Sequence, residues 1–163
     1  MPAPVHAVQL SNNVRRRHTS MQSVEKFMRQ YFDERIAEEK REQASRAPFR
    51  RKFHTDDCFF DSRAGTLEMI QSEKVLKVSA SDSTADVITT RHSPTLSDSV
   101  HQLRYHLQSG QDGWLIQSVD VWCHSCRGEA KDDCIFCHGT GWFDGRKPKA
   151  GLPKRDIPPS RIS

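Results

Sequence analysis

The chain has 163 residues, of which 35% are hydrophobic and 28% are charged, and its mean hydropathy is −0.74. This composition is too polar for a membrane protein, and no run approaches the ~18 apolar residues that a transmembrane helix needs. The first ten residues lack a basic segment followed by an apolar stretch, so we expect no secretory signal and a cytoplasmic location.

The net charge of +4 is concentrated at the two ends of the chain. Residues 1–20 contain three arginines and no acidic residue, and residues 144–163 contain six basic residues against two acidic ones. Residues 21–143 contain 16 basic and 19 acidic residues. Four of the eight prolines also fall in 144–163. We therefore expect disordered basic tails at residues 1–18 and 144–163 around a mildly acidic body.

A long N-terminal helix is predicted to begin near Thr19, where Thr19 and Gln22 can form a capping box. Its apolar residues recur at helical spacing and make one stripe. They are Val24, Phe27, Met28, Tyr31 and Phe32. The polar run that follows extends the helix outward, and Pro48 is expected to end it.

Shorter elements follow the long helix. Residues 49–57 are predicted to form a short helix or turn, and residues 58–61 a short strand. Thr66 can cap another short helix that turns Leu67 and Ile70 inward. Four strands are then expected, at residues 75–80, 85–92, 100–108 and 113–122.

The last two predicted strands differ in pattern. Leu103, Tyr105 and Leu107 alternate with polar residues, which is typical of an antiparallel strand with one face in water. Residues 114–122 are apolar on both sides, which favours a central position in the sheet.

The order of these elements resembles the nuclear transport factor 2-like superfamily, which includes ketosteroid isomerase and polyketide cyclases. Residues 53–61, 78–89 and 113–120 carry the resemblance. It implies an α+β fold over residues 19–122, in which N-terminal helices pack in a strongly bent, cone-like antiparallel sheet. Members of this superfamily are enzymes or binding modules, and their sheets often pair into dimers, so a homodimer is one expectation.

Four of the five cysteines fall within fifteen residues, in the pattern C-x2-C-x7-C-x2-C. The set is Cys123, Cys126, Cys134 and Cys137. A two-residue gap lets both thiolates of a pair bind one ion from a single tight turn, and two such turns supply four sulfurs at tetrahedral corners. The second half reads C-x-x-C-x-G-x-G and resembles the zinc repeats of J-domain chaperones. Residues 123–143 are thus predicted to be a metal-binding segment.

Because protein would fill all four ligand positions, we expect one structural zinc ion per chain rather than a catalytic one. Iron is the alternative ion. Two disulfides are disfavoured because they would need an oxidising compartment, and no secretory signal is expected. A redox-active pair is disfavoured because such a C-x-x-C normally opens a helix after a strand, which this glycine-rich segment does not resemble. His124 and His138 are expected to be exposed neighbours of the ligands, and Cys58 a small buried hydrophobe.

An isomerase-type site needs a carboxylate base in an apolar pocket and a tyrosine as oxyanion donor. Both tyrosines lie on predicted apolar faces. Candidate carboxylates are Asp57, Asp61 and Asp120, and candidate histidines are His54, His92 and His101. Tyr31, Asp61, His101 and Tyr105 form the selected pocket set. Each candidate also has a structural alternative. The tyrosines can pack in the core, and Asp57 and Asp61 can cap or turn the backbone. Asp120 can be a polar residue at the edge of the sheet or can support the metal-binding turns.

No catalytic residue is assigned, because no Ser-His-Asp, phosphate-loop or H-E-x-x-H motif is present. The favoured function is a non-enzymatic binding or adaptor protein whose cone or sheet face binds a small molecule or a protein. A small isomerase, cyclase or dehydratase is the first alternative. A nucleic-acid-binding zinc module is the second, and it is disfavoured because residues 123–143 carry more acidic than basic residues.

Overall fold

The computed structural model describes residues 23–41, 47–58, 66–93 and 100–143. The expected tails, the capping box at Thr19 and the pocket candidate Asp61 lie outside these ranges, as does most of the strand expected at 58–61. Within these ranges, no helix combines the length and the apolar character that crossing a membrane requires.

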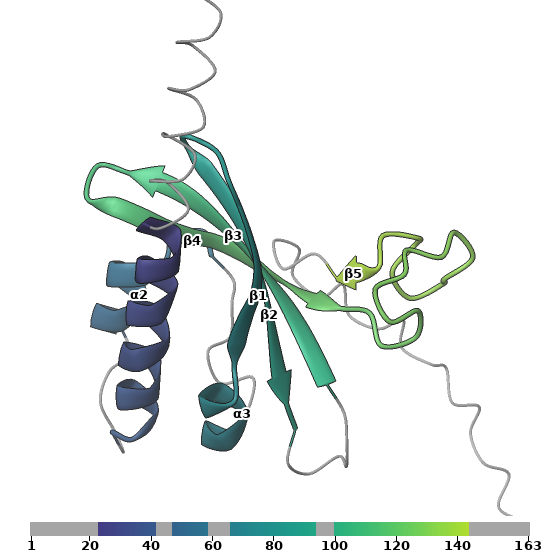
Figure 1. The fold of residues 1–163 in the computed structure, drawn as a ribbon, viewed down its shortest axis with the longest axis horizontal. Helices are drawn as coiled ribbons and strands as arrows, with labels where there is room; N and C mark the ends of the chain where they lie inside the picture. Colours follow the sequence, from purple (N-terminus) through teal and green to yellow (C-terminus); the bar gives the residue numbers. More distant parts are fainter. Residues whose placement is uncertain (1–22, 42–46, 59–65, 94–99, 144–163) are drawn as a thin grey trace, which may run out of the picture.

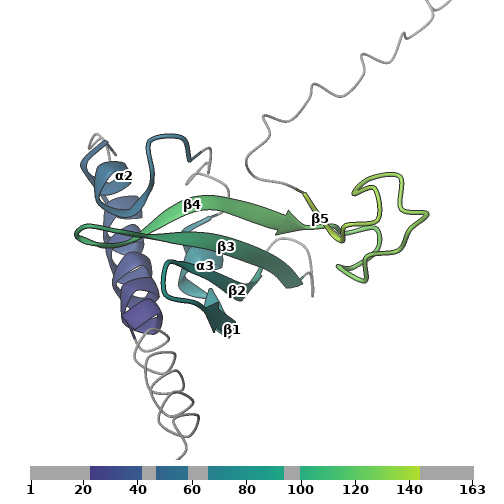
Figure 2. The ribbon, with the colours of Figure 1, turned by 90° about the horizontal axis from the view of Figure 1, so that it is seen from above.

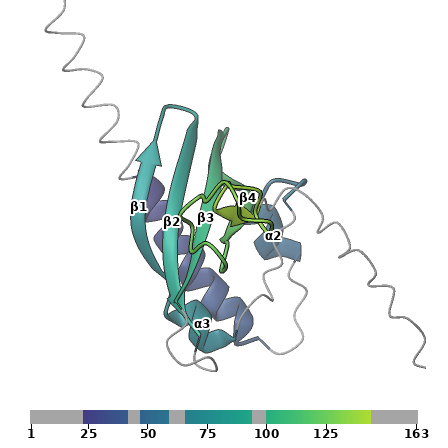
Figure 3. The same ribbon diagram turned by 90° about the vertical axis from the view of Figure 1, so that its right-hand side faces the viewer.

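Five antiparallel strands form one sheet in which spatial order follows sequence order. The strands are β1 (Lys74–Ala80), β2 (Thr84–His92), β3 (Val100–Gly110), β4 (Gly113–Trp122) and β5 (Trp142–Phe143). Figure 1 shows a strongly twisted sheet, and Figure 3 shows the helix of residues 23–39 crossing one of its faces. This arrangement confirms the mixed α+β class.

The helix of residues 23–39 presents its buried side chains at spacings of four, three and four residues. They are Val24, Met28, Tyr31 and Arg35, each at most 1% exposed. The expected stop at Pro48 was wrong, because the helix gives way to a turn at Lys40. Pro48 instead lies in the first turn of α2 (Ala47–Phe53), where its missing N–H needs no partner.

The short helix α3 (Leu67–Gln71) is capped as predicted: Met69 N–H donates to Thr66 Oγ1 over 3.4 Å. Ile70 is its buried residue. Glu73 lies between this helix and β1, and its side chain is buried in the interior.

β4 lies inside the sheet: β3, the middle strand, pairs with it on one side, and the two residues of β5 and a bridge from His54 to Ile116 lie along it on the other. A bulge explains why Ile116 and Val119, three residues apart, pair with Leu107 and Tyr105 on one face of the sheet. His106 pairs with Ser118 and Leu107 with Ile116, so Gln117 is an extra residue that shifts the alternation.

The space between the helices and the sheet is filled by aromatic rings centred on Tyr31. Its ring centroid lies 5.5–5.9 Å from five neighbouring rings. These belong to Phe32, Phe49, Phe53, His54 and Tyr105. Because these rings come from the helix of residues 23–39, from α2 and from β3, their packing joins all three.

A buried polar group lies beside this aromatic core. Glu73 Oε1 accepts hydrogen bonds from the Tyr105 hydroxyl at 2.6 Å and from Thr89 Oγ1 at 2.7 Å. Glu73 Oε2 faces Arg35 Nη1 at 3.3 Å, and the two side chains are at most 1% exposed. Burial, together with the Glu73 charge, raises the pKa of Tyr105, so its hydroxyl stays protonated and donates. The carboxylate therefore ties the helix to β2 and β3.

Replacing Glu73 alone should be far more destabilising than replacing both members of its ion pair. Glu73→Leu leaves the Arg35 guanidinium buried without its carboxylate, which costs about 3–5 kcal/mol of unfolding free energy. The double variant Arg35→Met/Glu73→Leu should recover most of that loss. Urea denaturation of the three proteins measures both effects, and a Glu73→Leu variant as stable as the parent would contradict the assignment.

Candidate metal centre

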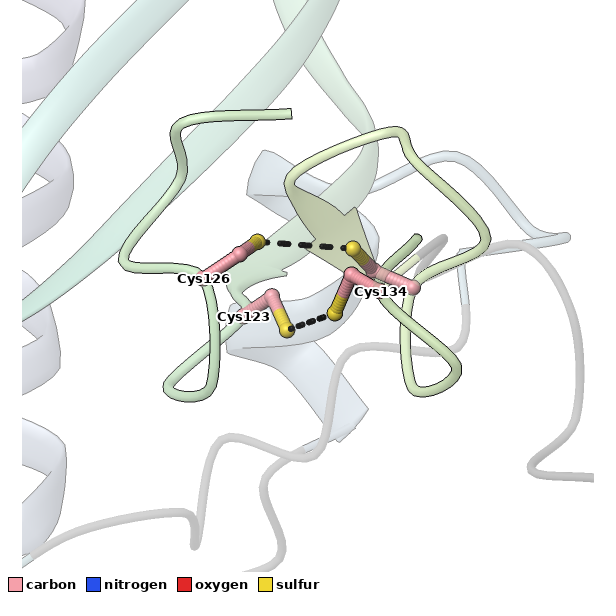
Figure 4. A group of neighbouring side chains, drawn as sticks. Cys123, Cys126 and Cys134 are labelled. Atoms are coloured by element: carbon pink, nitrogen blue, oxygen red, sulfur yellow. Dashed lines mark hydrogen bonds between the residues drawn. The ribbon is translucent and has the colours of Figure 1, made fainter. Parts of the chain in front are cut away.

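The four clustered cysteine sulfurs lie within 4.8 Å of one another. Two Sγ–Sγ distances are 3.7 Å, for Cys123 and Cys134, and 3.5 Å, for Cys126 and Cys137. A tetrahedral ion with sulfurs at about 2.3 Å would set its ligands about 3.8 Å apart. Figure 4 shows Cys123 and Cys126 on one turn facing Cys134 on the other. The sulfurs therefore have the spacing of a metal-binding set.

The same cysteines are free thiols, as is Cys58. Their sulfur separations greatly exceed the ~2.05 Å of a disulfide bond. The two-disulfide alternative is therefore not the arrangement that the structure adopts.

The two metal turns repeat the same backbone path at an interval of 11 residues. After the first turn, Glu129 N–H donates to the Cys126 carbonyl at 3.0 Å, and after the second, Thr140 N–H donates to the Cys137 carbonyl at 3.1 Å. Two residues with positive φ follow each pair. They are Arg127 (51°) and Gly128 (75°), and His138 (51°) and Gly139 (80°). The four sulfurs thus come from two near-copies of one turn.

One glycine of the second turn has no glycine counterpart in the first turn. Gly141, with φ of 77°, is matched in the first turn by Ala130, with φ of 50°. A Cβ on Gly141 would lie 2.8 Å from the Gly128 carbonyl oxygen, so this site accepts only glycine. Ala130 therefore holds a left-handed conformation that a side chain disfavours.

Backbone amides lower the pKa of one of the four clustered thiols. The amides of Cys137 and Phe136 donate to the Cys134 sulfur and lower its pKa to about 7, which favours the thiolate that metals bind. Burial raises the pKa of Cys137 to about 11, and Gly141 N–H donates to its sulfur at 3.3 Å.

The metal segment leaves the sheet from β4 and returns beside it as β5. Cys123 follows β4 directly, and its N–H donates to the Gly141 carbonyl at 2.9 Å. The indole of Trp122 covers Gly128 so closely that a Cβ there would lie 2.2 Å from its Nε1. Figures 1 and 2 both show these turns at the end of the sheet opposite the helix of residues 23–39.

Asp120 lies on the other face of the sheet from Tyr105 and is 3% exposed. Its Oδ2 accepts from Arg104 Nη2 at 2.6 Å and lies 2.8 Å from His106 Nε2, while His106 Nδ1 lies 2.6 Å from Asp86 Oδ1. The Arg104 guanidinium stacks 4.7 Å from the centroid of the Trp142 ring. Asp120 is thus no edge residue, and it is connected to β5 through Arg104.

Hydrogen bonds from its ring to the Asp120 carboxylate and to the Asp86 carboxylate raise the pKa of His106, although burial opposes the shift. An imidazolium can donate from both nitrogens, which suits a histidine placed between two carboxylates. Because the folded pKa lies above the unfolded value near 6.5, this bridge stabilises the sheet fully below that value. The contribution is lost as pH rises through the raised pKa of His106.

The structure brings together two of the four pocket candidates. Tyr31 and Tyr105 are both buried, with ring centroids 5.9 Å apart. His101 is half-buried, and its ring lies 4.9 Å from that of His124, between the first two cysteines. Its pKa is lowered by burial and by the nearby His124 and Arg91.

The other candidates are placed apart from this pair. Asp57 is exposed and accepts from Thr55 Oγ1 at 2.6 Å, which fits its alternative role in a turn. His92 is exposed at the end of β2. His54 is 6% exposed among the aromatic rings, and burial, together with Arg50 and Arg35, lowers its pKa to about 4. His54 is therefore a neutral core residue at physiological pH.

Three residues of the interior polar group were absent from the candidates: Arg35, Glu73 and Thr89. Arg35 continues the buried stripe of the helix four residues after Tyr31, so the spacing alone could have placed it inside. Glu73 stands in a polar stretch between α3 and β1, and nothing in that stretch distinguishes it from a surface acid.

Comparison of the chain with protein-family models, with curated proteins and with solved structures found no match. The resemblances to the nuclear transport factor 2-like superfamily and to the chaperone zinc repeats therefore rest on the sequence patterns alone.

Loss of one clustered cysteine should abolish stoichiometric metal binding, whereas loss of Cys58 should not. Cys126→Ser removes one of four ligands and leaves the others to hold the ion with a weaker donor set. The matched control Cys58→Ala removes a thiol from the main core, where it contacts none of the clustered sulfurs. Elemental analysis of the purified proteins should find about one metal ion per chain in the control and much less in Cys126→Ser.

Equal metal content in both variants would contradict a four-sulfur site. A strong chelator applied to the unaltered protein should leave the far-ultraviolet circular dichroism of the sheet in place, because the main core and the cysteine cluster are separate. Complete loss of that signal would show that the sheet depends on the metal.

Opposite substitutions at the two matched turn positions should have opposite effects. Ala130→Gly relieves a left-handed alanine and should stabilise the metal-loaded protein by about 0.5–1 kcal/mol. Gly141→Ala should destabilise it by more than that, because the new Cβ meets backbone as well as a disfavoured φ. Chemical denaturation of both variants checks this, and a less stable Ala130→Gly would refute the equivalence of the turns.

Proposed function

We propose that this protein is a non-enzymatic binding module in which the four-cysteine cluster holds one structural zinc ion. One observation carries the proposal: four sulfurs within 4.8 Å fill every position of a tetrahedral ion. Such a site leaves no position for a catalytic water, so its contribution is to folding. An all-thiolate tetrahedral set suits zinc, and iron is the other ion that it can accept.

Residues 19–122 are proposed to have the cone-like fold of the nuclear transport factor 2-like superfamily. A helix packed on the face of a twisted antiparallel sheet, with α2 and α3 beside it, supports this assignment. In this arrangement the metal segment is an addition at the end of β4, and it presents a rigid tip away from the helix.

The tip of the second metal turn is the proposed contact for a protein partner. Ile135 and Phe136 lie between the last two cysteines and are 77% and 59% exposed. The matching residues of the first turn are His124 and Ser125, both polar and exposed. Both turns have the same backbone path, and the first one forms it with polar residues. The apolar pair is therefore not needed to form the second turn. We infer that this pair inserts into an apolar pocket of a partner.

A small enzyme of the isomerase, cyclase or dehydratase type remains the alternative. The 2.6 Å hydrogen bond between Tyr105 and Glu73 favours it, because a tyrosine and an acid in an apolar interior can act on a carbonyl. Against it, Glu73 is already bonded to Thr89 and Arg35, and the aromatic rings around Tyr31 occupy the adjoining space. A binding role therefore accounts better for the interior.

The apolar tip can be tested by exchanging it for the polar pair of the first turn. The variant Ile135→His/Phe136→Ser should keep its metal content and melting temperature, because the first turn carries the same residues. Partner proteins cross-linked to the parent in native extract should be depleted with the variant, as quantified by mass spectrometry. Identical capture by both proteins would contradict a contact at the tip.

A further inference from the structure

A second interior arginine, Arg91 of β2, is buried and has no counter-ion in the part of the chain that the structure describes. Its side chain belongs to a residue only 6% exposed, and its Nε and Nη1 atoms are buried with no hydrogen-bond partner. No ion pair found among the described residues includes it. Two buried guanidinium nitrogens whose N–H groups meet no acceptor are unfavourable, so a negatively charged acceptor would stabilise this site.

The described part of the interior offers no spare carboxylate. Arg91 points to the same face of the sheet as Thr89 and Tyr105, whereas Asp120 lies on the opposite face. Glu73 is the buried acid on the interior side, and both of its oxygens are engaged by Arg35, Thr89 and Tyr105. The described interior therefore holds two guanidiniums against one carboxylate.

A second unsatisfied donor lies in the same interior. The Tyr31 hydroxyl is buried and makes no hydrogen bond within the described residues. Tyr31 packs against Tyr105, with ring centroids 5.9 Å apart, and Tyr105 lies on the same face of the sheet as Arg91. His101, paired opposite Arg91 in the ladder of β2 and β3, adds a half-buried imidazole.

We propose that Arg91 binds the oxyanion of a small ligand inside the sheet, with the Tyr31 hydroxyl available as a second donor. An oxyanion accepts several hydrogen bonds at once, and those from a guanidinium are strengthened by charge. The same chemistry is offered by an organic carboxylate and by inorganic phosphate.

The test uses the full, metal-loaded chain and two probes, benzoate and inorganic phosphate, each compared with chloride at equal ionic strength. The parent should show a rise in melting temperature with benzoate, with phosphate, or with both, beyond the effect of chloride. The response to each probe distinguishes the two sources of oxyanion. In parallel, the Arg91 side-chain Nε–H signal should shift in nuclear magnetic resonance spectra during the titration.

Two variants make the result specific to Arg91. Arg91→Met should weaken binding of the active probe at least about tenfold, the loss expected for one charge-assisted hydrogen bond. Without anion it should be as stable as the parent or more so, because it removes an unpaired buried charge. Lys77→Met, which removes an exposed positive charge from β1, should respond like the parent.

The proposal is overturned if neither probe acts beyond chloride, or if Arg91→Met keeps the full response. Metal content is measured in the same samples. Because Arg91 is not among the cysteine ligands, unchanged metal content in Arg91→Met separates failure of the anion site from failure of the proposed zinc site.

Discussion

Convergence of four cysteine sulfurs within 4.8 Å is the constraint on which the C-terminal part of this protein depends. The apolar cluster around these turns consists of the cysteines themselves, so hydrophobic burial contributes little to holding them. Thiolate–metal bonds can supply that missing free energy, as in other small metal-stabilised segments. The turns also rely on backbone conformations that glycine allows, most clearly at Gly141, where a side chain would meet Gly128.

The sheet and the metal turns are connected by polar contacts as well as by the chain. Asp120 is held by Arg104 and His106, and the same Arg104 stacks on Trp142 of β5. On the other side of the metal segment, Trp122 covers Gly128. These contacts fix the direction in which the turns leave the sheet.

Local patterns predicted local features well. The alternation of Leu103, Tyr105 and Leu107 gave the buried face of β3, and Thr66 caps α3. The two C-x-x-C pairs predicted one cluster because spacing within a turn determines where sulfurs can point. Features that depend on tertiary contacts could not be read this way. Neither the bulge at Gln117 nor the pairing of β5 with β4 has a signature in the sequence.

In the candidate pocket, too, local features were predicted correctly and tertiary contacts were not. Both tyrosines lie inside, as their apolar faces indicated, yet the acid beside Tyr105 is Glu73 and not one of the aspartates proposed for that role. Three elements meet at Glu73, and a single sequence does not reveal which polar residues such a meeting will bury. The uneven charge that results, with Arg35 paired and Arg91 not, is visible only in the assembled interior.

The central claim concerns what the four sulfurs hold, and X-ray absorption spectroscopy of the purified full chain tests it most directly. The account predicts a zinc edge and a single first shell of four sulfurs at about 2.3 Å. An iron edge would replace the proposed ion but keep the four-sulfur site. A first shell containing nitrogen or oxygen, or a protein without bound metal, would contradict the account.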